Sequence, residues 1–367
     1  MKHIIKTGIF SMALLIAGTT FAGNKDRAGQ AGASHLLINP WARSSGWGGA
    51  GAAYDRGLEG QFMNVASLAF TKQTEIVFAH TRWLEGAGIS INTAGIAQNL
   101  GKTRGVIGLT FSAMSFGEIP VTTVDKPEGT GATYSPRYLN IGVSYARSFS
   151  KRIHGGVTAR VINEAIGNIS ANGFTIDAGV SYTASIGKKA DADEFNNLIF
   201  GIALKNVGPK MKYVGDGLDQ TVTLPNGAEL TAAQKSAAFE MPALMNLSAM
   251  YRFRIKKEHI ISAAFNFTTN SFTKDQFILG LEYNWKDILM LRGGYTFENG
   301  IFSGNRDALN STLTNAFTGP SCGATVDIPL GKTSEEKKVK PKFGLDYSFR
   351  STYNFKGVHT FGARITL

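Results

Sequence analysis

Residues 358–367 read VHTFGARITL, a stretch in which apolar and polar positions alternate up to the chain end. One side carries His359, Phe361, Ala363, Ile365 and Leu367, and the other carries Val358, Thr360, Gly362, Arg364 and Thr366. At the end of a soluble sheet, such a strand would be an unprotected edge. In a closed barrel it pairs with the first strand, so every backbone polar group is satisfied inside a membrane. The stretch therefore predicts an all-β, transmembrane, antiparallel β-barrel.

The same alternation recurs from residue 74 onward. In the segment 277–285, one side carries Phe277, Leu279, Leu281, Tyr283 and Trp285, and the other carries Gly280, Glu282 and Asn284. An apolar face toward lipid and a polar face toward the lumen is typical of transmembrane barrels. A soluble sandwich also alternates, but its polar face meets bulk water and rarely needs many glycines. A lumen crowded by another segment is predicted by the glycines of the polar sides, namely Gly142, Gly179, Gly201, Gly280, Gly294, Gly344 and Gly362.

We count about fourteen such segments, an even number as in single-chain bacterial barrels. They begin near residues 74, 87, 105, 138, 154, 173, 197, 244, 259, 276, 288, 310, 342 and 357. An even count places both ends of the barrel on the periplasmic side. The longest connections, 117–138 and 207–243, then lie outside the cell, and short turns such as 286–287 lie inside. This asymmetry is expected of such barrels.

The N-terminus has the composition of a secretory signal. Its start is basic, its middle is apolar and uncharged, and Thr20-Phe21-Ala22 offers a small-x-small cleavage site. The apolar run is shorter than the ~20 residues that a membrane-spanning helix needs, which disfavours an anchor. We therefore expect a signal peptide at 1–22, a hatch at 23–73 and the barrel at 74–367.

The segment 23–73 is Gly-rich, has small residues and lacks barrel-length alternation. A lumen enclosed by about fourteen strands leaks unless it is filled, and the aromatic residues of the segment disfavour a disordered tail. The stretch 46–51 spells G-x-G-x-x-G, but it lacks the strand and helix of a dinucleotide site, so we interpret it as close backbone packing. We expect a hatch inside the lumen, packed through Trp41, Arg43, Gly46, Trp47, Gly48, Gly49 and Asn64.

The motifs argue against catalysis. Cys322 is the only cysteine, so there is no internal disulfide framework. The histidines lack metal-ligand spacing, and no G-x-S-x-G elbow is present. We expect no catalytic residue, metal or cofactor. A weaker alternative is a barrel phospholipase that uses Ser144, Ser181 or Ser248.

Charge patterning predicts partners outside and inside the barrel. The formal net charge is +11, which on an exported barrel favours anionic lipid headgroups or acidic proteins over nucleic acid. Charges in a narrow lumen need partners. We expect pairing with the hatch from the inward-facing set Asp177, Glu282, Arg252, Arg254, Arg292 and Arg364.

Several stretches carry a family resemblance. The segment 39–53 reads NPWARSSGWGGAGAA and 62–69 reads FMNVASLA. These are similar to the Ala-Arg-x-x-Gly-x-Gly-Gly-Ala and Trp-Asn-Pro-Ala-Gly-Leu-Ala stretches of the PorV/PorQ family of the Bacteroidetes type IX secretion system. Met63 stands in place of the Trp and Val65 in place of the Pro. Further similarity lies in 115–119 (SFGEI), 142–147 (GVSYAR), 205–210 (KNVGPK) and 291–295 (LRGGY).

The resemblance implies a hatch-filled barrel similar to the FadL fatty-acid channels. It also implies a non-enzymatic outer-membrane component that binds or shuttles secreted proteins with C-terminal signal domains between translocon and attachment complex. Its partners would be subunits of those complexes, the cargo proteins and outer-membrane lipid. The loop 207–243 would either hold partners or fold over the barrel mouth, through Met211, Tyr213, Val214, Leu218, Leu230, Phe239 and Met241. The rival interpretation is a FadL-like transporter of hydrophobic small molecules.

Overall fold

The computed structural model describes residues 23–101, 103–186, 197–256, 258–302, 313–331, 341–352 and 355–367. The expected signal peptide at 1–22 lies outside these described residues. Within them, no helix has the length and apolar character needed to cross a bilayer.

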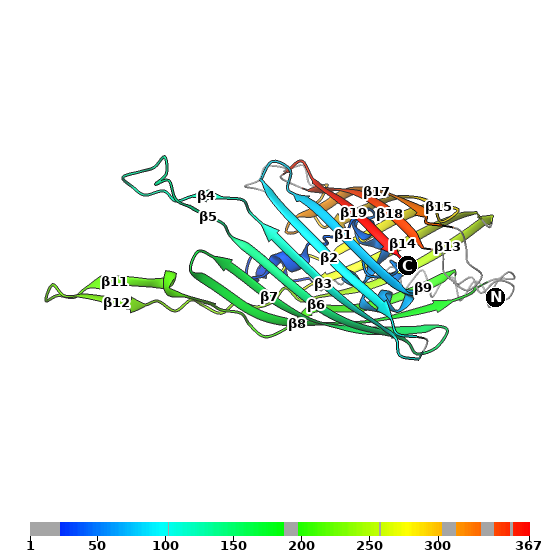
Figure 1. Cartoon of the computed structure of the whole chain (residues 1–367), viewed down its shortest axis with the longest axis horizontal. Helices are drawn as coiled ribbons and strands as arrows, with labels where there is room; N and C mark the ends of the chain where they lie inside the picture. Colours follow the sequence, from blue (N-terminus) through cyan, green and yellow to red (C-terminus); the bar gives the residue numbers. More distant parts are fainter. Residues whose placement is uncertain are drawn as a thin grey trace.

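An antiparallel sheet forms the body of the molecule (Figure 1). It contains 15 strands, and because β10 (Tyr213–Val214) is only a short addition beside β8, the other 14 form the wall. These are β1 (Thr74–Trp83), β2 (Ile89–Asn99), β3 (Val106–Ser115), β6 (Arg137–Ser148), β7 (Ile153–Ile166), β8 (Ile169–Ala184), β9 (Leu198–Val207), β13 (Leu244–Lys256), β14 (His259–Asn270), β15 (Gln276–Trp285), β16 (Leu289–Glu298), β17 (Phe317–Pro329), β18 (Lys342–Thr352) and β19 (Val358–Thr366).

The wall closes on itself, which confirms the expected all-β barrel of about fourteen strands. The first strand pairs with the last, from Glu75 opposite Thr366 to Arg82 opposite His359. On the far side of the ring, β8 pairs with β9. Closure gives each wall strand a neighbour on both sides, so the terminal strand is protected as the sequence predicted.

Side chains alternate between lipid and lumen as expected. On β15, Leu279 and Leu281 are exposed on the outside, while Gly280 and Glu282 are buried inside. Most other wall strands repeat this pattern, so exposed apolar side chains surround the barrel. An outward apolar band with a polar interior is the surface that a membrane-spanning barrel presents to lipid.

Two strands begin away from their predicted positions. The strand expected near 173 begins at Ile169, because the β7–β8 hairpin continues to a tight turn in which Gly167 adopts a φ of 52°. The strand expected near 310 begins at Phe317. The residues just before it are held as a loop by the Glu298 carboxylate, which accepts hydrogen bonds from the backbone N–H groups of Thr314 and Asn315.

Two arms project beyond one end of the barrel (Figure 1). The smaller is the pair β4 (Ile119–Pro120) and β5 (Thr133–Tyr134). The larger is the ribbon of β11 (Asp219–Thr223) and β12 (Glu229–Ala233), whose two strands pair only with each other. The structure thus gives the loop 207–243 a hairpin that the sequence did not predict.

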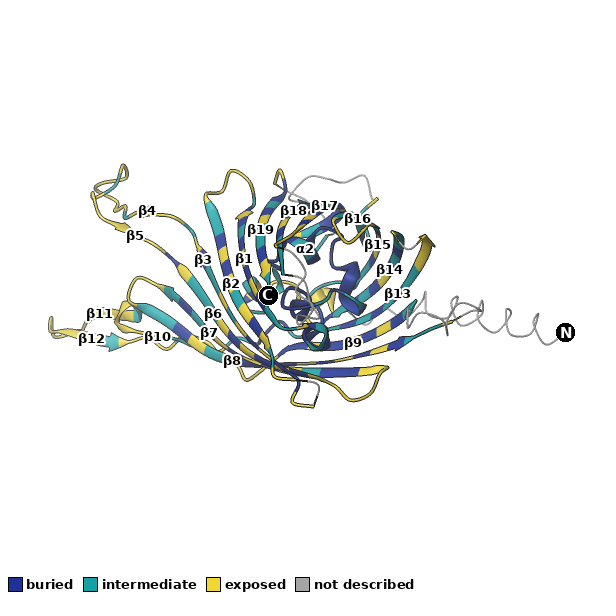
Figure 2. Ribbon diagram, turned by 45° about the vertical axis from the view of Figure 1, so that its right-hand side comes forward, coloured by how far each residue is buried: buried dark blue, intermediate teal, exposed yellow. Residues whose placement is uncertain are grey.

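Residues 23–73 fold inside the ring of strands, where Figure 2 shows most of them as buried. Short helical turns suit this small space because they satisfy backbone groups locally. They are η1 (Lys25–Arg27), η2 (Ser34–Leu37), α2 (Ala42–Ser45), η3 (Ala50–Ala53), η4 (Gly60–Phe62) and η5 (Val65–Phe70). We call residues 23–73 the hatch.

Candidate functional site

Two tryptophans anchor the hatch to opposite parts of the wall. Trp47 is buried in one cluster with Ile199, Met250 and Ile278 of the wall. Trp41 lies in a second cluster, which includes Val77 of β1. A buried aromatic side chain removes a large apolar area from water, so these contacts dominate the packing energy of the hatch.

The glycines on the inner wall face the hatch. A Cβ atom added to Gly280 would lie 2.6 Å from the Cβ of Ala50, and one added to Gly294 would collide with the backbone carbonyl of Trp47. At Gly362 the nearest atom would be the Cβ of Ala42, at 3.1 Å. The glycines on the polar faces of the strands predicted that another segment fills the lumen. The hatch is that segment.

Three glycines of the hatch, Gly46, Gly48 and Gly49, also have physical reasons to be glycine. A Cβ on Gly46 would lie 3.0 Å from the Cα of Gly323, so the two backbones touch. Gly48 and Gly49 have φ values of 70° and 94°, which side-chain-bearing residues rarely adopt. Close packing accounts for this stretch without a nucleotide.

Asn64 joins a hatch turn to the wall. Its Oδ1 accepts a hydrogen bond from the Ala66 N–H at 3.0 Å and caps η5. Its Nδ2 donates to the carbonyl of Val180 on β8 at 3.1 Å. The side chain leaves no room for a Cβ at Gly179, which explains another wall glycine.

A buried charge network ties the hatch to the last strands. Arg364 of β19 donates to Asp327 of β17 at 2.6 Å and to Glu59 of the hatch at 3.5 Å. The other carboxylate oxygen of Glu59 accepts from the backbone N–H of Arg43 at 2.9 Å. Burial raises the pKa of Glu59 above its ordinary value, because two arginines compensate only part of the lost hydration.

The inward-facing charged residues, which we expected to pair with the hatch, mostly pair with other residues of the wall. Among the described residues, Arg364 is the member of this set with an ion pair to a hatch carboxylate, Glu59. Asp177 instead pairs with Arg160 on the neighbouring wall strand at 2.8 Å, and Glu282 pairs with Arg292 at 2.7 Å. Residues that are opposite or diagonal on adjacent antiparallel strands are closer than residues across the lumen. Pairs between neighbouring strands are therefore favoured over pairs with the hatch.

The seven apolar loop residues divide into two groups. Met211 and Met241 are 1% and 4% exposed, and they pack against Leu36 of the hatch and Ile162 of β7. Tyr213 and Phe239 lie partly buried beside them, and Leu218 is half-buried. Only Val214 and Leu230 are well exposed, at 56% and 54%. The base of the loop therefore folds over the barrel mouth, and the remaining part stands free.

A polar cluster that the sequence did not reveal links three parts of the chain. The Glu164 carboxylate on β7 lies 3.2 Å from Nδ1 of His35 in the hatch and accepts a short hydrogen bond from the hydroxyl of Tyr213 at the loop base. Nearby, Glu240 of the loop pairs with Arg27 of the hatch at 3.0 Å. Neither pair has a sequence signal, because the partners are far apart in the chain.

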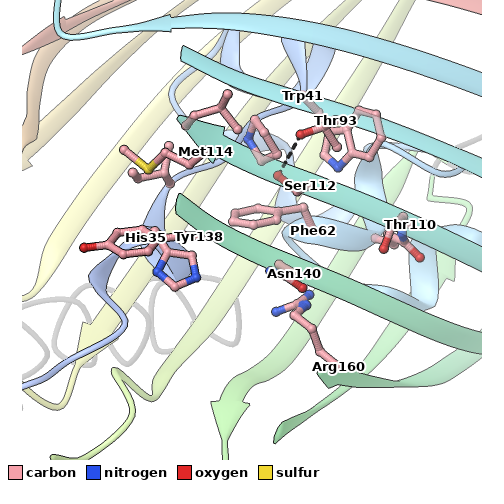
Figure 3. Close-up of a pocket in the computed structure, with 14 residues that line it drawn as sticks. His35, Trp41, Phe62, Thr93, Thr110, Ser112, Met114, Tyr138, Asn140 and Arg160 are labelled. Atoms are coloured by element: carbon pink, nitrogen blue, oxygen red, sulfur yellow. Dashed lines mark hydrogen bonds between the residues drawn. The ribbon is translucent and has the colours of Figure 1, made fainter. Parts of the chain in front are cut away.

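Between hatch and wall, the described part of the chain contains cavities, of which two are relevant to function. The smaller, of about 40 Å³, is shown in Figure 3, where Trp41 and Phe62 of the hatch lie among Thr93 and Ser112 of the wall. The hydroxyls of Thr93 and Ser112 are 2.9 Å apart. The larger cavity, of about 560 Å³, lies between the hatch and the outer connections and includes Lys205 in its lining.

None of the three candidate serines hydrogen-bonds a histidine or a carboxylate in the described residues, although His154 lies opposite Ser181 on the neighbouring strand. Ser144 bonds the hydroxyl of Thr158, Ser181 donates to the carbonyl of Ala53, and Ser248 donates to that of Gly201. Within the same described part of the chain, no group of three or more His, Cys, Asp or Glu residues could hold a metal ion.

Comparison with solved structures returns, among others, a monoaromatic hydrocarbon channel and a toluene transporter. The TodX deltaS2S3 mutant monoaromatic hydrocarbon channel has a TM-score of 0.51 at 12% identity, covering 88% of this chain and 97% of that one. The toluene transporter TodX of P. putida has a TM-score of 0.50 at 12% identity, covering 89% and 97%. At this identity they show the fold alone. A comparison with curated proteins returns no match.

A family model covers more than half of the chain. The model described as type IX secretion system protein PorV matches residues 21–244, which include the hatch, the first seven barrel strands and the loop that carries the ribbon. Its match agrees with the motifs at 39–53 and 62–69. The chain belongs to the PorV family of type IX secretion system proteins.

Proposed function

We propose that this barrel is an outer-membrane component of the type IX secretion system. It binds secreted proteins that carry C-terminal signal domains and passes them between translocon and attachment complex. The division into signal peptide at 1–22, hatch at 23–73 and barrel at 74–367 is part of the proposal. The partners are translocon or attachment-complex subunits, the cargo and outer-membrane lipid, with no nucleic acid, metal or catalytic step.

One observation carries the proposal: apolar side chains stand exposed on the outer ribbon. Leu230 and its cross-strand partner Val222 are exposed, as is Leu224 at the turn. The hatch and the loop base leave these residues uncovered, and they lie outside the barrel wall. Exposed apolar groups on a projecting element mark a protein-binding surface, and the free edges of a two-stranded ribbon can accept another strand.

The filled lumen supports a binding role over a conduit for folded protein. Trp41, Trp47 and the Glu59–Arg364 pair hold the hatch within the ring. Buried ion pairs are costly to break, because removal of one partner leaves an uncompensated charge. Cargo would therefore meet this barrel at its outer face.

Affinity purification tests the proposal. The tagged full-length protein is extracted in mild detergent from its own outer membrane, and the co-purifying proteins are identified by mass spectrometry. We expect translocon or attachment-complex subunits, or proteins with C-terminal signal domains. The double variant Val214→Ser/Leu230→Ser should reduce their recovery about tenfold, whereas Val124→Ser, which changes a valine that is 99% exposed on the smaller arm, should not. Recovery of the barrel alone from wild-type membranes would contradict the proposal.

A second candidate function is a transporter of hydrophobic small molecules. The larger cavity favours it, because its lining includes Trp83, Met114 and Phe116 and its volume of about 560 Å³ suits a small ligand. The named structural neighbours are channels for aromatic hydrocarbons. Uptake of labelled toluene into cells that depend on this barrel tests the candidate. Equal uptake with and without the barrel would rule it out for this substrate.

A further inference from the structure

The hatch begins against a buried carboxylate. The backbone nitrogen of Gly23, the first described residue, donates a hydrogen bond to the carboxylate of Asp275 at 2.7 Å. Asp275 is 4% exposed and ends the connection 271–275 between β14 and β15. Its other carboxylate oxygen accepts from the backbone N–H of Asn270 at 3.3 Å. The strand order puts this connection at the same end of the barrel as the two arms, so the hatch begins at the outer end.

Gly23 fits its position because it has no side chain. A Cβ atom added to it would lie 2.6 Å from the backbone nitrogen of Asp275 and 2.8 Å from the carbonyl oxygen of Thr273. Backbone atoms cannot turn aside as the end of a flexible side chain can, so a larger residue would have to leave this position. The backbone of 273–275 and the Asp275 carboxylate therefore form a socket that admits a glycine.

The residues that follow Gly23 join two outer connections. The guanidinium carbon of Arg27 lies 4.2 Å from the centre of the Phe272 ring, and the same guanidinium pairs with Glu240 at 3.0 Å. The backbone N–H of Gly32 donates to the carbonyl of Glu240 at 3.1 Å. Phe272 belongs to the connection that forms the socket, and Glu240 belongs to the base of the loop that carries the ribbon. The seating of the hatch start therefore affects both connections.

Removal of the signal changes the chemistry of the Gly23 nitrogen. The cleavage expected after Ala22 is hydrolysis of one peptide bond by one water molecule, which leaves a carboxylate on Ala22 and an amine on Gly23. An α-amine is protonated to an ammonium at neutral pH. In the uncleaved chain, the same atom is an amide that donates one hydrogen bond and carries no charge. Cleavage thus places a positive charge 2.7 Å from a buried carboxylate oxygen.

We propose that the socket binds the mature N-terminus, with the Gly23 ammonium paired to the Asp275 carboxylate. A charged donor makes a stronger hydrogen bond than an amide does, and a buried pair is screened less by salt than an exposed one. The pair secures the start of the hatch, and through Arg27 and Glu240 the base of the loop, once the signal has been removed. This pairing rests on the proposed function only in requiring that the signal peptide is cleaved.

Amine labelling of the mature barrel tests the pairing. The full-length protein is purified from its own outer membrane and acetylated at pH 7, where the reagent favours α-amines because fewer of them than of lysines are protonated. Mass spectrometry of the N-terminal peptide identifies the first residue and gives the acetylation rate in folded and in urea-unfolded protein. We expect the chain to begin at Gly23. Its acetylation should be at least about tenfold slower in the folded protein, as a hydrogen bond between charged groups gives.

Variants separate the charge of the socket from its fit, with each rate compared to that of the same variant when unfolded. Asp275→Asn keeps the shape of the acceptor without its charge and should raise the folded-state rate about tenfold. Gly23→Ala keeps a small residue after the cleavage site and should also raise the rate, because its Cβ has no room. Asp26→Asn removes an exposed carboxylate near the same end and should leave the rate unchanged. Heat-modifiable migration shows which variants are folded.

Three other outcomes overturn the proposal. Equal acetylation rates in folded and unfolded wild-type protein would show that the amine is not held in the socket, and this comparison needs no variant to fold. Equal rates in folded Asp275→Asn and wild type would show that the carboxylate does not hold the amine. A first residue other than Gly23 would mean that no ammonium forms at this position, whereas the secretion role would still stand or fall by the affinity purification.

Discussion

The hatch and the outer ribbon are built in opposite ways. Most hatch residues from Ala42 to Leu68 are buried, and they are held by two tryptophan clusters and an internal ion pair. The ribbon residues of β11 and β12 are nearly all exposed, and these strands pair only with each other. Burial fixes a segment in one place, whereas exposure leaves its side chains free for a partner. In our proposal, the stability of the barrel therefore depends on the packed lumen, and partner recognition depends on the exposed ribbon.

The largest expected effect is on the packing of the hatch. Trp47→Ala removes a fully buried side chain between Ile199, Met250 and Ile278, so we expect a loss of about 3–5 kcal/mol in the free energy of unfolding. Urea titration in lipid vesicles, followed by intrinsic fluorescence, measures it. A loss below about 1 kcal/mol would mean that the hatch does not contribute to the stability of the barrel.

Two neighbouring glycines on β16 can show whether the hatch packs against this strand. A Cβ at Gly294 would collide with the backbone of Trp47, whereas one at Gly293 would meet nothing within 4 Å. We expect Gly294→Ala to lower the free energy of unfolding by about 1–3 kcal/mol, because the hatch must shift. Gly293→Ala should change it little. Equal effects in the two variants would show that the hatch is not seated against this strand.

The packing of the hatch should weaken as the pH rises. Burial raises the pKa of Asp55 to about 7, although Arg292 and Arg43 oppose the shift. A carboxyl with a raised pKa stabilises the folded state while it is protonated, and this contribution is lost as the pH rises through 7. We expect the free energy of unfolding to be about 2 kcal/mol lower at pH 8.5 than at pH 5.5, because each pH unit between 5.5 and 7 removes about 1.4 kcal/mol. Asp55→Asn should remove the part of this difference that Asp55 contributes and leave the part due to Glu59, whose pKa burial also raises. An unchanged pH dependence in that variant would assign the whole difference to other groups.

The smallest expected effect on stability lies in the ribbon. Leu230→Ala truncates an exposed side chain, so the free energy of unfolding should change by less than about 0.5 kcal/mol. The same urea titration measures it beside Trp47→Ala. A loss comparable to that of Trp47→Ala would show that the ribbon packs against the barrel and is not free to bind.

Much of the wall could be predicted because the alternation of apolar and polar residues indicates which face of the sheet each side chain occupies. The segment 277–285 alternates between lipid and lumen as its sequence indicates. Gly294 pointed to a neighbour in the lumen, and the structure identifies that neighbour as Trp47. Both signals are local, since a strand has a period of two residues.

The site could be predicted only in part because its contacts are distant in sequence. Met211 and Val214 are both apolar residues of one loop, yet one packs on Leu36 and the other is exposed. Composition cannot distinguish them, because burial depends on where the hatch lies. The pairing of His35 with Glu164, and the contact of Gly23 with Asp275, arise in the same way from closure of the barrel.

Site-specific photo-crosslinking in living cells tests whether the outer ribbon binds secreted proteins or secretion-system subunits. A photoreactive residue is placed at Leu230 on the ribbon and, as a matched control, at Leu281 on the lipid-facing wall, where exposure is similar. We predict that position 230 captures secreted proteins with C-terminal signal domains or secretion-system subunits, and that position 281 does not. The same crosslinked proteins at both positions, or none at position 230, would contradict recognition by the outer ribbon.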